Sequence, residues 1–141
     1  MKAKIIIFFE ILFVMLSLSC TDDNSLIPQV ENGNFSIYVS NQSSTLDPVD
    51  INVYIDGKPA IKQEFYWLNG SNHLIFQFQL DGEEHRLSAT SVNGNISKDT
   101  TFNLTITPYS YISFWYEPAH DQYDEYKNLS VKFFQKAPVF M

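Results

Sequence analysis

Cysteine is almost absent from this 141-residue chain, which holds one, Cys20. No disulfide can form within the rest of the chain, so the fold must be stabilised by an apolar core. Glycine is scarce too, at five residues, and neither a phosphate-binding glycine loop nor a Gly-x-Ser-x-Gly elbow occurs. No helical period lasts for three turns after residue 20. These absences argue against the enzymes that such motifs define and against a helical fold.

Basic residues are also few, since nine Lys and Arg stand against sixteen Asp and Glu, a net charge of −7. An acidic chain repels phosphate backbones, so nucleic acid is not an expected partner. The histidines His73, His85 and His120 lack metal-ligand spacing. His85 begins an inward-facing strand and is expected to be a hydrogen-bonded structural histidine. We therefore predict that the chain is not an enzyme and has no cofactor and no metal.

The longest apolar run stands near the start of the chain, at residues 5–18. A short basic stretch, residues 1–4, precedes it, and Ser19-Cys20 ends it. This is the layout of a secretory signal peptide, with a small residue before the cleavage site. The run has 14 residues, fewer than the roughly 20 that a membrane-spanning helix needs.

Residues 16–20, Leu-Ser-Leu-Ser-Cys, resemble the lipobox of bacterial lipoproteins. Two features depart from that pattern, because Ser17 replaces the usual Leu and Glu10 interrupts the apolar run. The resemblance implies that residues 1–19 are removed as a lipoprotein signal peptide and that Cys20 carries the lipid, palmitate among its acyl chains. The alternative is an ordinary secretion signal that ends in an incidental cysteine.

Asp22 and Asp23 follow the cysteine directly. This acidic pair resembles the surface-export signal of Bacteroidota lipoproteins, which implies attachment to the outer membrane with the domain exposed at the cell surface. The alternative location is the periplasmic face. Residues 20–33 are polar, contain Pro28 and Gly33, and are expected to form a tether.

From residue 34 to 141 the sequence has the period of two that is typical of half-buried strands. Apolar and polar side chains alternate at residues 35–40, 49–56, 74–80, 85–91, 102–106, 109–116 and 129–133. Asp56-Gly57, Asp81-Gly82 and Asn93-Gly94 are turn signals. Pro59 indicates an edge strand or a loop. We predict a single all-β domain, an antiparallel immunoglobulin-like β-sandwich of seven or eight strands.

Two segments carry a family resemblance: residues 53–58, with their Tyr-x-Asp-Gly-Lys turn, and the strand, turn and strand of residues 76–90. Together they resemble bacterial immunoglobulin-like and PEGA-type surface modules. The whole chain is also similar to small surface lipoproteins of Bacteroidota. These resemblances imply a fold and a location but no activity.

Residues 109–116 form the most aromatic segment. Tyr109, Tyr111 and Trp115 share one face of a strand there, while Ile112 and Phe114 share the other. If Ile112 and Phe114 enter the core, the three aromatic residues form an exposed platform that can stack on sugar rings or anchor a protein interface. The alternative is that both faces are covered and that Trp115 lies in the core.

Two further sites are suggested by short patterns. Asp99-Thr100-Thr101 resembles the O-glycosylation site of Bacteroidota, which implies Thr100 as the acceptor. The acidic residues of the 117–125 loop leave calcium binding open, because calcium prefers carboxylate oxygens, although the spacing is not that of an EF-hand. A solvated acidic loop is the alternative.

These observations lead us to expect a non-catalytic, membrane-anchored lipoprotein that acts as a surface or periplasmic binding or interaction module. Two alternatives remain, a glycan-binding accessory protein that uses the aromatic platform and an inhibitor or immunity lipoprotein. The expected partners are the membrane, through Cys20, and a protein or a glycan.

Overall fold

The computed structural model describes residues 25–67, 73–120 and 123–140, and strands are the regular secondary structure within these ranges. The eight strands are β1 (Phe35–Asn41), β2 (Val49–Ile55), β3 (Lys58–Phe65), β4 (Leu74–Phe78), β5 (Glu84–Ser91), β6 (Ile96–Asn103), β7 (Tyr109–Glu117) and β8 (Tyr126–Phe134). The prediction of an all-β fold is confirmed. None of these described ranges contains a helix long and apolar enough to cross a membrane. The predicted signal peptide and Cys20 lie outside the described residues.

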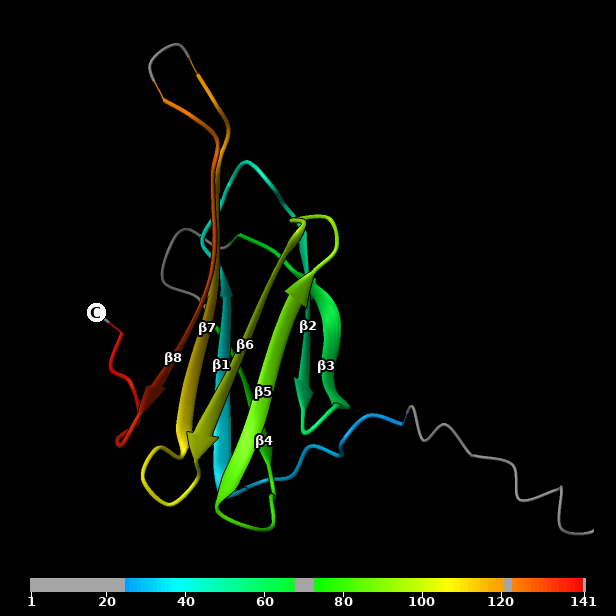
Figure 1. The fold of residues 1–141 in the computed structure, drawn as a ribbon, viewed down its shortest axis with the longest axis vertical. Coiled ribbons are helices and arrows are strands. Elements are labelled where there is room, and N and C mark those ends of the chain that lie inside the picture. The colour runs from blue at the N-terminus through cyan, green and yellow to red at the C-terminus, as the bar shows by residue number, and fades with distance from the viewer. Residues whose placement is uncertain (1–24, 68–72, 121–122, 141) are drawn as a thin grey trace, which may run out of the picture.

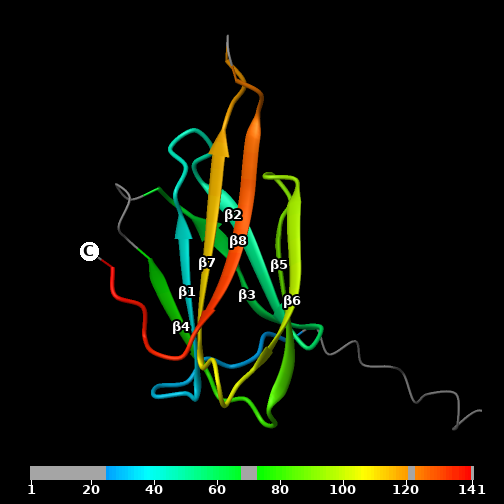
Figure 2. The same ribbon diagram turned by 60° about the vertical axis from the view of Figure 1, so that its left-hand side comes forward.

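The strands form two four-stranded sheets, with the orders β4-β1-β7-β8 and β3-β2-β5-β6. Figure 2 shows β1, β7 and β8 in one layer and β5 and β6 in the other. In an immunoglobulin constant-type domain the second and third strands belong to opposite sheets. Here β2 and β3 are hydrogen-bonded neighbours, so the strand order differs from the immunoglobulin order although two sheets enclose one core.

One pairing corrects the prediction of a purely antiparallel fold. β1 and β7 pair in parallel, with Tyr38 opposite Tyr111 and Ser40 opposite Ser113. The other strand pairs are antiparallel. The reason lies in the connections, because a chain that reverses direction after each strand makes all odd-numbered strands run the same way. β1 and β7 are both odd-numbered, so their pairing must be parallel (Figure 1).

The core lies between the two sheets and is built by the inward residues of the alternating segments. Phe76, Phe78, Leu87 and Ala89 are all buried, as the period of two predicts. Phe35 stacks on Phe102 with ring centroids 4.5 Å apart, which joins β1 of one sheet to β6 of the other. Burial of these apolar side chains provides the stabilisation that disulfides do not.

The strand predicted at residues 102–106 is misplaced. The strand β6 ends at Asn103, and a turn follows in which the Asn103 Oδ1 accepts a hydrogen bond of 3.0 Å from the backbone N–H of Thr105. Asparagine favours such turns because its side chain replaces a backbone acceptor. Ile106 is therefore 56% exposed instead of continuing the inward face. The proline prediction is confirmed, since Pro59 lies on the edge strand β3 next to a register shift.

Part of the predicted tether packs against the domain. The backbone N–H of Ile27 donates to the Pro59 carbonyl over 2.8 Å, and that of Val30 donates to the Gln77 carbonyl over 3.0 Å. Gly33 lies so close to β4 that a Cβ there would come within 2.3 Å of the Phe78 carbonyl oxygen. The segment from Ile27 to Gly33 therefore lies along the folded domain.

Candidate functional site

The two faces of β7 are divided as one of the two sequence interpretations predicts. Ile112 and Phe114 are fully buried between the sheets. Trp115 points the other way and is 46% exposed, so the alternative that placed Trp115 in the core is wrong. Tyr109 and Tyr111 share its face and are half-buried. The outer face of the β4-β1-β7-β8 sheet is therefore aromatic, but its three predicted platform residues are not equally accessible.

Tyr111 is covered by the end of the chain. After β8 the chain turns back along the outer side of this sheet (Figures 1 and 2). The ring centroid of Phe140 lies 5.2 Å from that of Tyr111, 5.7 Å from that of Tyr38 and 3.9 Å from that of His73. Burial, and secondarily the charge of a neighbouring ionised Tyr109, raises the pKa of the Tyr38 phenol. The predicted row of three aromatic residues is thus divided into a covered part and an open part.

The open part borders a shallow groove with a volume of about 290 Å³, which we call the Trp115 groove. Its lining residues are Gln42, Ser113, Trp115, Tyr126, Asn128, Ser130 and Lys132. Two of them are exposed aromatic residues, Trp115 at 46% and Tyr126 at 52%. The groove therefore combines aromatic surface with side chains that can donate and accept hydrogen bonds.

The pairing of β7 with β8 sets the positions of most lining residues. Trp115 lies opposite Asn128, and Ser113 lies opposite Ser130. Residues directly opposite each other in an antiparallel pair point to the same face. Tyr126, two residues before Asn128, points to that face as well and lies diagonally across from Trp115.

Gln42 reaches the groove from the end of β1. Its backbone N–H donates to the Phe114 carbonyl over 2.8 Å, which continues the parallel pairing of β1 with β7. Its side-chain Nε2 donates to the Tyr111 hydroxyl over 3.3 Å and to the Ser40 hydroxyl. These hydrogen bonds fix the position of the Gln42 amide.

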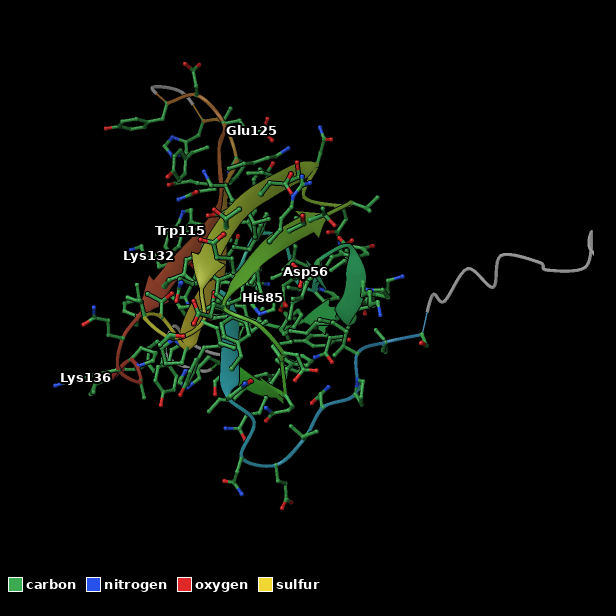
Figure 3. The ribbon with its side chains drawn as sticks, turned by 60° about the horizontal axis from the view of Figure 1, so that its bottom comes forward. Asp56, His85, Trp115, Glu125, Lys132 and Lys136 are labelled. Atoms are coloured by element: carbon green, nitrogen blue, oxygen red, sulfur yellow. The ribbon has the colours of Figure 1, made fainter. Side chains whose placement is uncertain are left out.

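Lys132 carries the only charge among the residues that line the groove. Within the part of the chain that the structure describes, it has no ion-pair partner. Figure 3 shows Trp115, Lys132 and Lys136 on one side of the molecule, away from Asp56 and His85.

His85 is the hydrogen-bonded structural histidine that the sequence predicts. It is 7% exposed, and its Nδ1 lies 2.7 Å from the Asp56 Oδ2. Its Nε2 is buried, has no hydrogen-bond partner within the described residues, and belongs to a ring packed beside Phe102 at 5.4 Å. The contact with Asp56 therefore fixes the orientation of the buried His85 ring.

Asp56 joins the β2–β3 turn to β5. Its carboxylate accepts a hydrogen bond from the His85 ring and another, over 2.8 Å, from the backbone N–H of Arg86. Partial burial of the carboxylate acts to raise its pKa, but the hydrogen bonds from His85 and Arg86 outweigh it and hold the pKa below the usual 3.8. Asp56 is in the left-handed backbone region, with φ of 51°.

Asp56→Asn should therefore remove a pH-dependent part of the stability. A carboxyl whose pKa is lower in the folded state stabilises the fold above its unfolded pKa, and this contribution is lost as the pH falls through the folded pKa. Asparagine tolerates the left-handed backbone and keeps an acceptor for Arg86. Urea unfolding should show the wild type more stable at neutral pH, with the difference shrinking below pH 3.8. A difference that is constant with pH would contradict this role of the charge.

Thr100 lies within β6, half-buried, on the face that also carries Phe102. Its hydroxyl donates to the Thr101 carbonyl over 3.4 Å. The preceding Asp99 is engaged by Arg86 over 3.2 Å and by the Ser88 hydroxyl. The role of Thr100 as a glycosylation acceptor stays a prediction.

The acidic loop is only partly described, because Asp121 lies outside the described residues. Glu125 pairs with Lys127 over 2.9 Å, and the hydrogen bond from Lys127 is the main reason that the pKa of Glu125 lies below its usual range. Glu117 lies 3.9 Å from the His120 Nε2. Over the described ranges, no three His, Cys, Asp or Glu side chains gather as a metal-binding group.

Comparison with protein-family models, with curated proteins and with solved structures gives no match to this chain. The geometry of the site is therefore the basis for a functional proposal.

Proposed function

We propose that this chain is a non-catalytic binding module whose ligand is a saccharide and whose ligand surface is the Trp115 groove. One observation carries the proposal: two exposed aromatic residues, Trp115 and Tyr126, border a single groove whose other lining residues are polar. A sugar ring has an apolar face of C–H groups that stacks on an aromatic ring, and hydroxyls around its edge that need hydrogen-bond partners. The groove offers both kinds of contact.

The polar lining suits a ligand that carries many hydroxyls. Asn128 presents an amide, and Ser113 and Ser130 each present a hydroxyl. Gln42 presents its side-chain carbonyl oxygen, because its amide nitrogen already donates to Tyr111 and Ser40. Amides and hydroxyls can both donate and accept, as sugar hydroxyls do. Most of these side chains stand on paired strands, so the backbone that carries them is already ordered before a ligand binds.

We propose further that a lipid on Cys20 holds this module at the outer membrane, with the cell surface as its location. The apolar run of residues 5–18 and the placement of the sole cysteine at its end support this anchor. A net charge of −7 disfavours direct binding to anionic headgroups, so the lipid would supply the membrane contact.

A protein partner, as in the inhibitor or immunity alternative, is favoured by a different observation. Tyr66, Trp67, Leu74 and Ile75 are large apolar residues that are 38–58% exposed around the edge strand β4. The backbone of Val30 already occupies the Gln77 carbonyl of β4, so we expect the exposed apolar side chains, rather than an added strand, to anchor a protein partner. Ile75→Lys should then abolish capture of that partner, whereas Trp115→Ala should leave it unchanged.

Trp115→Ala should weaken saccharide binding about thirtyfold, the loss expected when an interface residue worth about 2 kcal/mol is truncated. Affinity electrophoresis through gels containing different polysaccharides would measure it. Tyr123→Ala is the matched control, because Tyr123 is 67% exposed in the same hairpin but does not line the groove. Both variants should unfold at the wild-type denaturant concentration. Equal retention of the two variants would refute the groove as the ligand surface.

A further inference from the structure

The charge of the Trp115 groove is opposite to that of the protein as a whole. The chain carries sixteen acidic and nine basic residues. The groove is lined by no carboxylate, and its one charged side chain is Lys132. We propose that the groove selects anionic saccharides, those with carboxylate or sulfate groups, and that Lys132 binds the anionic group. This inference rests on the proposed saccharide-binding function.

The ammonium of Lys132 is available for a ligand. Lys127, on the same strand, is bound to Glu125 over 2.9 Å and lies over the ring of Tyr116 at 5.3 Å. Lys132 has no such partner within the described residues and is exposed. An unpaired lysine ammonium offers three hydrogen-bond donors together with a full positive charge.

The strand register places this charge at a useful distance from the stacking surface. Lys132 lies opposite Tyr111, whereas Asn128 lies opposite Trp115. Four residues along a strand span about 13 Å. A short oligosaccharide stacked on Trp115 and extended along β8 would therefore bring a later ring to Lys132. Asn128 would contact the ring on Trp115, and Ser130 the part between that ring and Lys132.

The remaining charges favour one orientation. Glu117 lies opposite Tyr126, at the far end of the groove from Lys132. Lys136, four residues after Lys132 in the chain, lies on the same side of the molecule as Lys132 and adds a second positive charge there (Figure 3). An anionic group is attracted to the Lys132 end and repelled from the Glu117 end. The attraction is between exposed groups, so salt should screen it.

The test compares matched neutral and anionic polysaccharides in affinity gels with the mature protein. The pairs are polygalacturonate with its methyl ester, and chondroitin sulfate with desulfated, carboxyl-esterified chondroitin. Wild type should bind the anionic member of at least one pair more tightly at low salt, and added salt should remove this preference. Lys132→Gln should weaken anionic binding about fivefold, the upper value for an exposed ion pair, and should weaken neutral binding by a smaller factor.

Lys98→Gln provides the charge control. It removes one positive charge from an exposed position on β6, in the other sheet, and should leave both kinds of binding unchanged. If Lys98→Gln and Lys132→Gln weaken anionic binding equally, or if wild type binds both members of each pair alike, the anionic preference is overturned while saccharide binding stands. If wild type binds no polysaccharide of either kind, the inference and the proposed function are both overturned.

Discussion

Replacement of Phe78 by alanine is expected to lower the free energy of unfolding by about 3–5 kcal/mol, the cost of deleting a buried aromatic ring. Phe78 is fully buried and pairs with Phe35 across β4 and β1. Its ring belongs to the core between the two sheets, so truncation leaves a cavity among buried apolar side chains. Domains of this size are stable by only about 5–15 kcal/mol, so the variant should lose much of its stability.

Ile75→Ala is the control within the same strand. Ile75 points to the outer face and is 51% exposed, so its truncation should cost at most about 1 kcal/mol. Urea unfolding followed by fluorescence would measure both losses. If the two variants lose similar stability, the division of β4 into an inner and an outer face is wrong.

The faces of individual strands could be predicted because the side-chain period of a strand is two. Alternation alone predicts an inward position for Phe76, Phe78 and Leu87, and it allows an outward position for Trp115. The buried position of His85 is predicted for the same reason, because His85 alternates in step with Leu87. The exposed position of Ile106 is not predicted, because a turn made by the Asn103 side chain ends the alternation before it.

The partners of each strand could not be predicted in the same way. Alternation shows which side chains point inward but not which distant strand lies alongside, and this is why the parallel pairing of β1 with β7 was missed. That pairing brings Gln42 to the groove. The contact of Phe140 with Tyr111 and His73 could not be predicted either. Residues 135–140 have no alternating pattern, and a single aromatic ring among them makes these contacts.

Some of the residues that line the Trp115 groove can be predicted from the sequence and others cannot. Trp115 follows from the pattern of β7, and Asn128, Ser130 and Lys132 follow from alternation with Leu129 and Val131 once β8 is known to pair with β7. Tyr126 follows an acidic loop, and no alternating pattern there predicts that β8 begins at this residue. The sequence alone therefore predicts Trp115, whereas the other side chains that line the groove are found only from the strand register.

Cys20→Ala is expected to release the protein from the membrane and to abolish its labelling by a radioactive fatty acid. The thiol of Cys20 is the only one in the chain, so no other cysteine can take the lipid. Each buried methylene contributes about 0.8 kcal/mol, and two or more acyl chains hold a protein stably where one chain does not. Loss of the chains should therefore move nearly all of the protein from the membrane fraction to the soluble fraction, or leave the precursor uncleaved.

The double variant Asp22→Asn, Asp23→Asn separates anchoring from display at the surface. It keeps Cys20 and should be labelled as strongly as the wild type, while its exposure to protease added outside intact cells should fall. Residues 20, 22 and 23 precede the β-sheet domain, which begins at Phe35, so saccharide binding by the purified proteins should match the wild type. Equal labelling of Cys20→Ala and wild type would show that the lipid is elsewhere or absent, and the signal would then be an ordinary secretion signal.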